Sequence, residues 1–286
     1  MKIWADFHTH TRYSHGRGWI EDNVRAAAQK GLKVLAITDH GPGVLWIGVP
    51  FARKISHLRE ELSRCAALYP QIELLLGVEA NIIGIDGTLD ITSAMVRELD
   101  FLIVGLHPWV FSRGFRSGLY LSFFNTLARL KILPPDISKG VNTQALINAI
   151  RRYPVDLVSH PGLFFTLDLP VLAGVCRERG TLLELNNNHV LQYGKQLKEA
   201  AENGALFAIN SDAHHPSAVG EMGDAVRAAR LLGIEEERIF NAGVYDGARQ
   251  AWIKGCRSRR GDLRRVLPGE LMHPIDTDKG GQKEDE

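Results

Sequence analysis

The sequence predicts an α/β protein built from seven parallel βα units, on the basis of three observations. Short apolar runs of strand length alternate with longer helical segments along the chain. Most of these runs are nearly continuous in apolar residues, which is typical of parallel strands buried on both faces. Several helical segments end in glycine just before the next run. Seven successive units predict a barrel, although a doubly wound open sheet would show the same rhythm.

The predicted strands are apolar segments of four to seven residues. They cover residues 2–7, 34–38, 73–79, 101–106, 156–159, 182–186 and 206–211. Gly31, Gly180 and Gly204 precede three of them. Because glycine readily adopts the left-handed conformation that closes a helix, we expect these three residues to join a helix to the next strand.

Helix starts are predicted from residues that can cap a helix. Ser93 precedes one helical segment, Asn142 and Thr143 precede another, and Asp168 stands just before Pro170. The side-chain oxygen of such a residue can accept a hydrogen bond from the first turn of the helix.

The length of 286 residues is compatible with one large domain, which we place at residues 1–267. Residues 108–141 break the βα rhythm because they are too long for a simple connection. This insertion could be an active-site lid, a contact between copies in a homo-oligomer, or an extra helix on the barrel wall. Residues 268–286 end in the polar, aromatic-free stretch DTDKGGQKEDE, so we expect a disordered tail.

The composition is that of an ordinary soluble protein. Hydrophobic residues make up 45% of the chain and charged residues 23%, and no apolar run is long enough to span a membrane. The first ten residues lack the pattern of a secretory signal, and the three cysteines are widely spaced. We therefore expect a cytoplasmic protein with no membrane partner. The net charge of +1 argues against nucleic acid as a partner.

Histidine and acidic residues gather at or just after the carboxyl ends of the predicted strands. Residues 6–16 read DFHTHTRYSHG, and further such residues follow the later strands. A barrel brings these ends together at one rim, where its active site lies. The predicted metal ligands are His8, His10, His15, His40, Glu79, His107, His160, Asp212 and His214.

Imidazole and carboxylate together favour zinc, manganese or iron over magnesium or calcium. Nine ligands exceed the needs of one ion and imply two or three. Glu79 can bridge two ions through its two oxygens. Asp6 and Asp39 are expected to orient ligands or handle protons. His189 and His215 are interpreted as structural residues or substrate contacts.

The motifs that carry these residues resemble those of the PHP (polymerase and histidinol phosphatase) family. The matching stretches are DFHTHT with His15, ITDHGP, GVEANI, GLHPWV, SHPG and NSDAHH. They are most similar to the small stand-alone bacterial members. The resemblance implies a distorted (β/α)7 TIM-like barrel with a three-metal phosphoesterase site at the carboxyl ends of its strands.

The resemblance also implies how the ligands are shared among three divalent transition-metal ions. The first ion would have His8, His10, Glu79 and Asp212. The second would share Glu79 and add His107 and His160. The third would have His15, His40 and His214. The insertion at 108–141 and the apolar loop at 44–51 depart from the pattern and leave the substrate's identity open.

The expected reaction is hydrolysis of a small-molecule phosphomonoester, in which metal-activated hydroxide attacks phosphorus. Arg17, in the loop after His15, either holds a phosphate oxygen or is a solvated surface residue. Asp39, His189 or metal-bound water could protonate the leaving group.

Three alternatives remain open at this stage. An amidohydrolase would also carry the HxH motif after its first strand, but it would leave His15, His40 and Glu79 without a role. Cleavage of nucleic-acid phosphodiesters would use the same metals. A non-catalytic metal-binding regulator would close all coordination positions and show no turnover.

Overall fold

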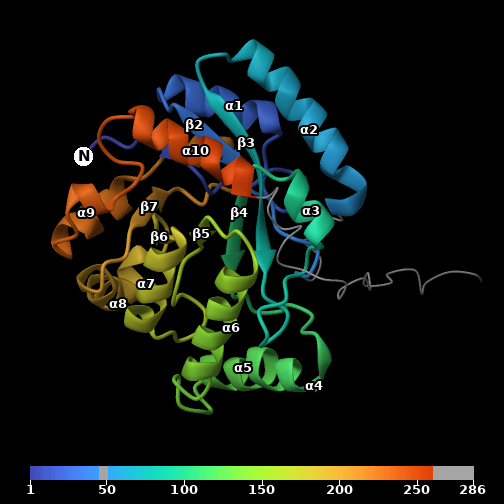
Figure 1. The fold of residues 1–286 in the computed structure, drawn as a ribbon, viewed down its shortest axis with the longest axis vertical. Coiled ribbons are helices and arrows are strands. Elements are labelled where there is room, and N and C mark those ends of the chain that lie inside the picture. The colour runs from blue at the N-terminus through green and yellow to red at the C-terminus, as the bar shows by residue number, and fades with distance from the viewer. Residues whose placement is uncertain (45–50, 260–286) are drawn as a thin grey trace, which may run out of the picture.

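A computed structural model describes residues 1–44 and 51–259 and shows seven parallel strands that alternate with helices in a nearly closed barrel (Figure 1). Neighbouring strands pair in sequence order from β1 to β7. This confirms the predicted barrel and excludes the doubly wound sheet, in which the strand order reverses. The strands are β1 (Ala5–Asp6), β2 (Val34–Ile37), β3 (Glu73–Asn81), β4 (Phe101–Gly105), β5 (Leu157–Val158), β6 (Leu182–Asn186) and β7 (Phe207–Asn210).

The helices lie outside the strands (Figure 1). Those of the βα rhythm are α1 (Ile20–Gln29), α2 (Phe51–Leu68), α3 (Ser93–Glu98), α6 (Lys139–Arg152), α7 (Leu169–Arg179), α8 (Val190–Glu202), α9 (Gly223–Leu231) and α10 (Gly247–Arg259). Two 3₁₀ turns, η2 (Pro216–Ala218) and η3 (Glu236–Arg238), follow β7. Within the described part of the chain, none of the helices has the length and apolarity needed to cross a bilayer.

Side chains make most of the join between the first and last strands, among them Asn241, Asn210 and Asp6. Asn241 Nδ2 donates to the carbonyls of Ala5 (2.8 Å) and Ile209 (2.6 Å), and its Oδ1 accepts from Ile209 N–H (3.0 Å). Direct backbone pairing resumes only at the carboxyl end, where Thr9 bridges Ala213. The side chain therefore satisfies backbone groups that a continuous β1–β7 ladder would otherwise pair.

Two apolar cores support the barrel. The outer core lies between strands and helices and takes alternate strand residues such as Leu74, Leu76 and Val78. The inner core contains the opposite residues of the strands together with Ile253 and Cys256 of α10. The inner core includes Trp4, Phe7, Val34, Leu75, Phe101, Leu157, Leu182 and Ala208. Helix α10 thus closes the amino-terminal end of the barrel, and the carboxyl end is left for polar groups.

The predictions of where helices begin and end were partly correct. Gly31, Gly180 and Gly204 all have positive φ (72°, 69° and 85°), which confirms their expected role. Asp168 caps α7 by accepting from Val171 N–H, also as expected.

Two of the predicted helix starts were wrong. Thr92, not Ser93, caps α3. Helix α6 already begins at Lys139, so Asn142 and Thr143 lie inside its first turns. They were misassigned because their side chains serve tertiary contacts, Asn142 with Asn125 (2.8 and 3.0 Å) and Thr143 with the backbone of Asp168 (2.9 Å).

The insertion at residues 108–141 contains a nearly continuous helical run. It consists of α4 (Gly114–Ser117), the π-helical stretch η1 (Gly118–Phe124) and α5 (Asn125–Arg129). Figure 1 shows α4 and α5 at the end toward which β3 and β4 point. The run packs on α6 through the paired amides of Asn125 and Asn142, as an extra helix on the barrel wall would. Its role in a homo-oligomer stays a prediction.

The three widely spaced cysteines, Cys65, Cys176 and Cys256, are buried thiols. The expected tail at 268–286 lies outside the described residues, as does most of the apolar loop at 44–51.

Replacement of Asn241 by alanine is expected to lower the free energy of unfolding by about 3 kcal/mol, because it leaves buried backbone groups of Ala5 and Ile209 without partners. Urea denaturation of the metal-free protein measures the change. Asn203→Ala is the matched control, because that exposed amide makes one hydrogen bond, to Glu199 O at the end of α8. Equal, small effects of the two substitutions would show that Asn241 does not close the barrel.

Candidate metal centre

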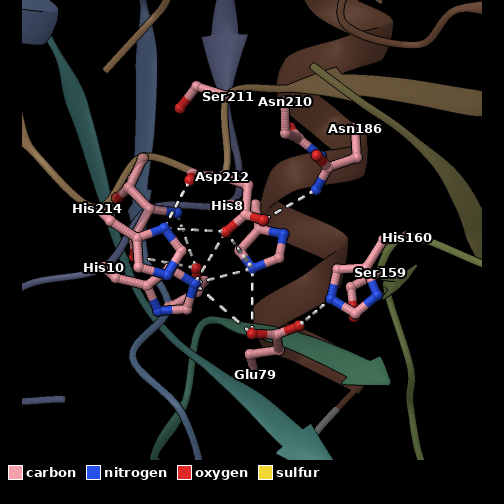
Figure 2. A network of polar contacts seen from close by, with 12 residues as sticks. His8, His10, Glu79, Ser159, His160, Asn186, Asn210, Ser211, Asp212 and His214 are labelled. Atoms are coloured by element: carbon pink, nitrogen blue, oxygen red, sulfur yellow. Dashed lines mark hydrogen bonds and ion pairs between the residues drawn. The ribbon is translucent and has the colours of Figure 1, made fainter. Parts of the chain in front are cut away.

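A buried glutamate, Glu79, lies among the predicted ligands at the carboxyl end of the barrel (Figure 2). Its Oε2 lies 3.0 Å from His40 Nδ1 and 3.2 Å from His8 Nε2. Its Oε1 lies 3.0 Å from His160 Nε2 and 3.1 Å from His107 Nε2. Each oxygen therefore faces a different pair of imidazoles, which suits a carboxylate that bridges two cations.

A second carboxylate, Asp212, completes the group around the two histidines of the HTH motif (Figure 2). Its Oδ1 lies 3.2 Å from His10 Nε2 and 3.6 Å from His8 Nε2. The Nε2 atoms of His8 and His10 are themselves 3.1 Å apart. The imidazoles of His8 and His10 therefore converge on one point, as the sequence predicted.

Strand alternation explains part of this arrangement. On β3, Leu75 belongs to the inner core, so Glu79, four residues later, also points inward. On β4, Phe101 and Ile103 are inner residues, and the same parity directs His107 to the rim. The ligands on these strands therefore continue the inward-facing rows of the barrel.

Two ligands depend instead on backbone conformations that non-glycine residues rarely adopt. His160 has φ 27° and Asp212 has φ 51°. Val158 on β5 is an outer residue, so regular alternation would turn His160 away from the barrel interior. The left-handed turn directs its imidazole toward Glu79. Such strained residues cluster at functional sites, where the surrounding structure holds them.

A group of four imidazoles lies beside Glu79. His10, His15, His40 and His214 each offer a nitrogen within 4.8 Å of the others. The ring centroids of His15 and His214 are 4.2 Å apart, and those of His15 and His40 are 4.9 Å apart. Two further groups of this kind are His8, His10 and Glu79, and His40, Glu79 and His107. His10 and His40 are thus each placed between two candidate positions.

The hydrogen bonding of this cluster fits bound cations. Four buried atoms, His10 Nδ1, His40 Nδ1, His107 Nδ1 and Glu79 Oε2, form no hydrogen bond, although His40 Nδ1 and Glu79 Oε2 lie 3.0 Å apart. Buried polar atoms without a hydrogen bond are rare, and they are expected where an ion supplies the interaction. The donor set of imidazoles and carboxylates suits zinc, manganese or iron.

The tautomers of two histidines are set by contacts outside the cluster. His8 Nδ1 lies 2.8 Å from Glu184 Oε1, and His214 Nδ1 lies 2.9 Å from the carbonyl of Asp212. In both rings Nδ1 acts as the donor, which leaves Nε2 free to bind a cation.

Glu184 is a functional residue that the sequence analysis missed. Its carboxylate accepts from His8 Nδ1, from His160 N–H (2.7 Å), and from the side-chain amides of Asn186 (3.1 Å) and Asn210 (3.0 Å). It therefore orients His8 and fixes the turn that carries His160. Its inward position on β6, two residues after the inner residue Leu182, was the available signal.

Asp39 anchors the first βα loop. Its oxygens accept hydrogen bonds from Thr11 N–H (2.7 Å), Thr11 Oγ1 (2.6 Å) and Ser14 Oγ (2.5 Å). This places the loop that carries His15. A proton-transfer role for Asp39 would have to compete with these three donors.

Asp6 and Asp90 hold two other loops of the rim. Asp6 accepts from Ser211 N–H (3.1 Å) and Ser211 Oγ (2.5 Å), next to Asp212. Asp90 accepts from the N–H of Gly43 (2.8 Å), in the loop that follows His40. A Cβ added at Gly41 would lie 2.5 Å from Asp90, so the close approach of this loop requires glycine. The sequence analysis assigned no role to Asp90.

The remaining predicted residues lie at different distances from the cluster. His189, the residue before α8, lines the same cavity as the metal ligands, and its Nδ1 lies 3.2 Å from Gln192 Nε2. Arg17 is exposed, contacts His214 only through its backbone N–H (2.9 Å) and is not among the residues that line the cavity. His215 caps η2 and bonds to Ser217, consistent with a structural role.

Burial and neighbouring charges separate the pKa values of these histidines. Burial and the adjacent imidazoles lower the pKa of His15 to about 4, and burial lowers the pKa of His40 well below its usual value. Burial also acts to lower the pKa of His8, but Glu184 and Glu79 outweigh it and raise that pKa well above its usual value. In the absence of a cation, His15 and His40 are therefore neutral at pH 7, whereas the surrounding carboxylates favour the protonated form of His8.

Comparison with known proteins places this arrangement in context. The model of the PHP domain matches residues 6–164, which is more than half of the chain. A probable phosphatase of Thermoanaerobacter sp. (strain X514) is 30% identical over 259 residues, covering 85% of this chain and 92% of that protein. A probable phosphatase of Shewanella sp. (strain ANA-3) is 29% identical over 251 residues, covering 84% of this chain and 88% of that protein.

Among solved structures, the fold is similar to that of a histidinol phosphate phosphatase from Lactococcus lactis subsp. lactis, which was crystallised with zinc, L-histidinol and phosphate. The TM-score is 0.53 at 12% identity, over 80% of this chain and 92% of that one. At this identity the match shows a shared fold.

The barrel, its cluster of imidazoles and carboxylates, and these matches define a metal-dependent phosphoesterase. The chain belongs to the PHP domain family. This membership favours the phosphoesterase interpretation over the amidohydrolase alternative.

Replacement of Glu184 by glutamine is expected to weaken metal binding by about 10- to 100-fold, because all four partners of this carboxylate are donors and an amide nitrogen would face one of them. Competition with a chromogenic chelator measures the affinity. Glu202→Gln, at an exposed position at the end of α8, is the control. Unchanged affinity in the Glu184 variant would show that this carboxylate does not orient the ligands.

Addition of zinc to the metal-free protein at pH 7 is expected to release protons, because the pKa of His8 is raised while a metal ligand must be neutral. Below the usual pKa of histidine, protons compete more strongly and the apparent affinity should fall. Calorimetric titration in buffers of different ionisation enthalpy counts the protons. An observed enthalpy that is independent of the buffer would contradict the assignment.

Proposed function

We propose that the protein hydrolyses small-molecule phosphomonoesters at a site that holds three divalent transition-metal ions, zinc, manganese or iron. The observation that carries the proposal is the position of Glu79, whose two oxygens each face a separate pair of imidazoles. A single ion would not require both pairs of imidazoles.

The proposed ligand sets follow the motifs. They are His8, His10, Glu79 and Asp212 for the first ion, Glu79, His107 and His160 for the second, and His15, His40 and His214 for the third. The short distances within each set support this division. His40 also lies 3.0 Å from Glu79, so it lies between the second and third sets.

When bound, the ions would lower the pKa of a water molecule and neutralise charge on the phosphoryl oxygens. The chain's own residues hold the ligands in place. Glu184 keeps Nε2 of His8 directed toward Glu79 and Asp212, and Asp39 holds the loop of His15. Hydrolysis forms a bond from a water oxygen to phosphorus, breaks the bond to the ester oxygen and yields phosphate and an alcohol.

His189 is the proposed proton donor to the departing alcohol, because it lines the cavity and Asp39 does not. Burial lowers the pKa of His189, so its protonated form is a strong donor. Phosphate contact through Arg17 would require its exposed side chain to turn toward the cavity.

The size of the cavity supports a small substrate. It has a volume of about 690 Å³ and contains both metal ligands and apolar residues. This lies in the range of small-molecule sites. The near-neutral charge of the chain supports the same choice over nucleic acid.

The test compares turnover of 4-nitrophenyl phosphate, bis(4-nitrophenyl) phosphate and single-stranded DNA by the purified protein before and after chelation. Monoester hydrolysis that is lost on chelation and restored by zinc or manganese is expected. Diester or DNA cleavage without monoester turnover would show that the protein is a phosphodiesterase instead. No turnover of any substrate by the metal-loaded protein would favour a binding protein.

The ligand assignment has its own test. His107→Ala is expected to lower kcat/KM for the monoester by at least about 100-fold, because it removes a group directed at Glu79. His57→Ala is the control, because this histidine is exposed on α2. Full metal content and full rate in the His107 variant would refute its role.

A further inference from the structure

One wall of the cavity at the metal centre is apolar. Beyond the candidate ligands and His189, the described residues that line the cavity are Val44, Pro108, Trp109, Leu163 and Phe164. They come from three separate segments, which follow β2, β4 and β5. Three of the βα loops that surround the metal centre therefore contribute apolar side chains to the same wall.

The apolar wall begins at the metal ligands themselves. The Phe164 ring centroid lies 5.3 Å from that of His160 and 5.9 Å from that of His107. Arg129 of the insertion lies over the Phe164 ring, with its guanidinium carbon 5.2 Å from the centroid. Groups of a substrate that lie just beyond its phosphate would therefore meet Phe164 in a held position.

Trp109 extends the wall toward solvent. Its side chain is 70% exposed although it is large and apolar. Its φ of 63° is unusual for a residue other than glycine, and it follows His107 by two positions. An exposed tryptophan in a strained turn beside a ligand gains little for stability, so contact with a bound molecule is the better explanation of its position.

Charged partners for the alcohol part of a substrate are missing from this wall. Among the described residues that line the cavity there is no lysine or arginine, and the only carboxylates are Glu79 and Asp212. Both of these face histidines. A substrate with an ammonium or second anionic group next to its phosphate would leave that charge without a partner, which costs affinity.

We propose that the substrate is a phosphomonoester of an apolar alcohol, alkyl or aryl, whose hydrocarbon part packs on Val44, Trp109, Leu163 and Phe164. This inference rests on the proposed phosphatase function and adds the chemical class of the alcohol. Trp109 and Phe164 determine specificity by contacting that part of the substrate. The reaction itself, transfer of the phosphoryl group to water, is unchanged.

A homologous series of substrates tests the inference. Ethyl, butyl and hexyl phosphate have leaving groups of nearly equal pKa, so differences in kcat/KM report contacts of the chain. Each methylene that packs on the wall is expected to raise kcat/KM by about fourfold. Histidinol phosphate, with its ammonium group, is expected to be hydrolysed less efficiently than hexyl phosphate.

Two variants connect the effect to the wall. Trp109→Ala and Phe164→Ala are each expected to lower kcat/KM for hexyl phosphate by about tenfold more than they lower kcat/KM for ethyl phosphate, because only the longer chain reaches the whole wall. Since Trp109 is exposed, its removal leaves the fold intact. Phe115→Ala is the matched control, because Phe115 is 84% exposed on the same insertion and does not line the cavity.

The outcomes separate the two proposals. A kcat/KM that does not increase from ethyl to hexyl phosphate, or that is higher for histidinol phosphate than for hexyl phosphate, overturns the inference about the alcohol and leaves the phosphatase function standing. An increase with chain length that persists in both wall variants also overturns it. Absence of turnover with every monoester overturns the proposed function itself.

Discussion

The burial of one carboxylate, Glu79, is the interaction on which the arrangement of the site depends. A charge removed from water must be compensated, and here imidazoles from four different strand ends surround its two oxygens. Burial lowers the pKa values of two of these imidazoles, His40 and His107, whereas neighbouring carboxylates raise those of His8 and His160. Neutral imidazole nitrogens such as those of His40 and His107 bind cations well, which suits the cluster to metal ions.

Other buried carboxylates hold the loops that carry the ligands. Glu184 holds the turn of His160, Asp39 the loop of His15, Asp90 the loop after His40, and Asp6 the segment before Asp212. In each case a carboxylate accepts a backbone N–H from a loop of a different βα unit. This arrangement ties neighbouring loops together at the rim, where strand pairing is reduced to isolated bridges such as Thr9–Ala213 and His40–Glu79. It also explains how two ligands are kept in left-handed backbone conformations.

The barrel divides stability and chemistry between its two ends. The inward-facing row of β3 passes from Leu75, in the apolar inner core, to Glu79 at the metal centre. At the amino-terminal end the interior is filled by side chains and closed by α10, so packing there tolerates a costly polar cluster at the other end. The apolar wall around Trp109 and Phe164 then lies between this polar cluster and solvent.

The sequence by itself determined the parallel barrel and the set of candidate ligands, because apolar runs, helix-ending glycines and residues at strand ends are local patterns. It also indicated that His8 and His10 converge. It did not reveal Glu184, whose importance comes from contacts with His8 and with the backbone of His160, 176 and 24 residues away. Nor did it show the backbone turn that redirects His160 or the engagement of Asp39 by the first loop. Only the tertiary structure decided these features, because each depends on contacts between segments that are distant in sequence.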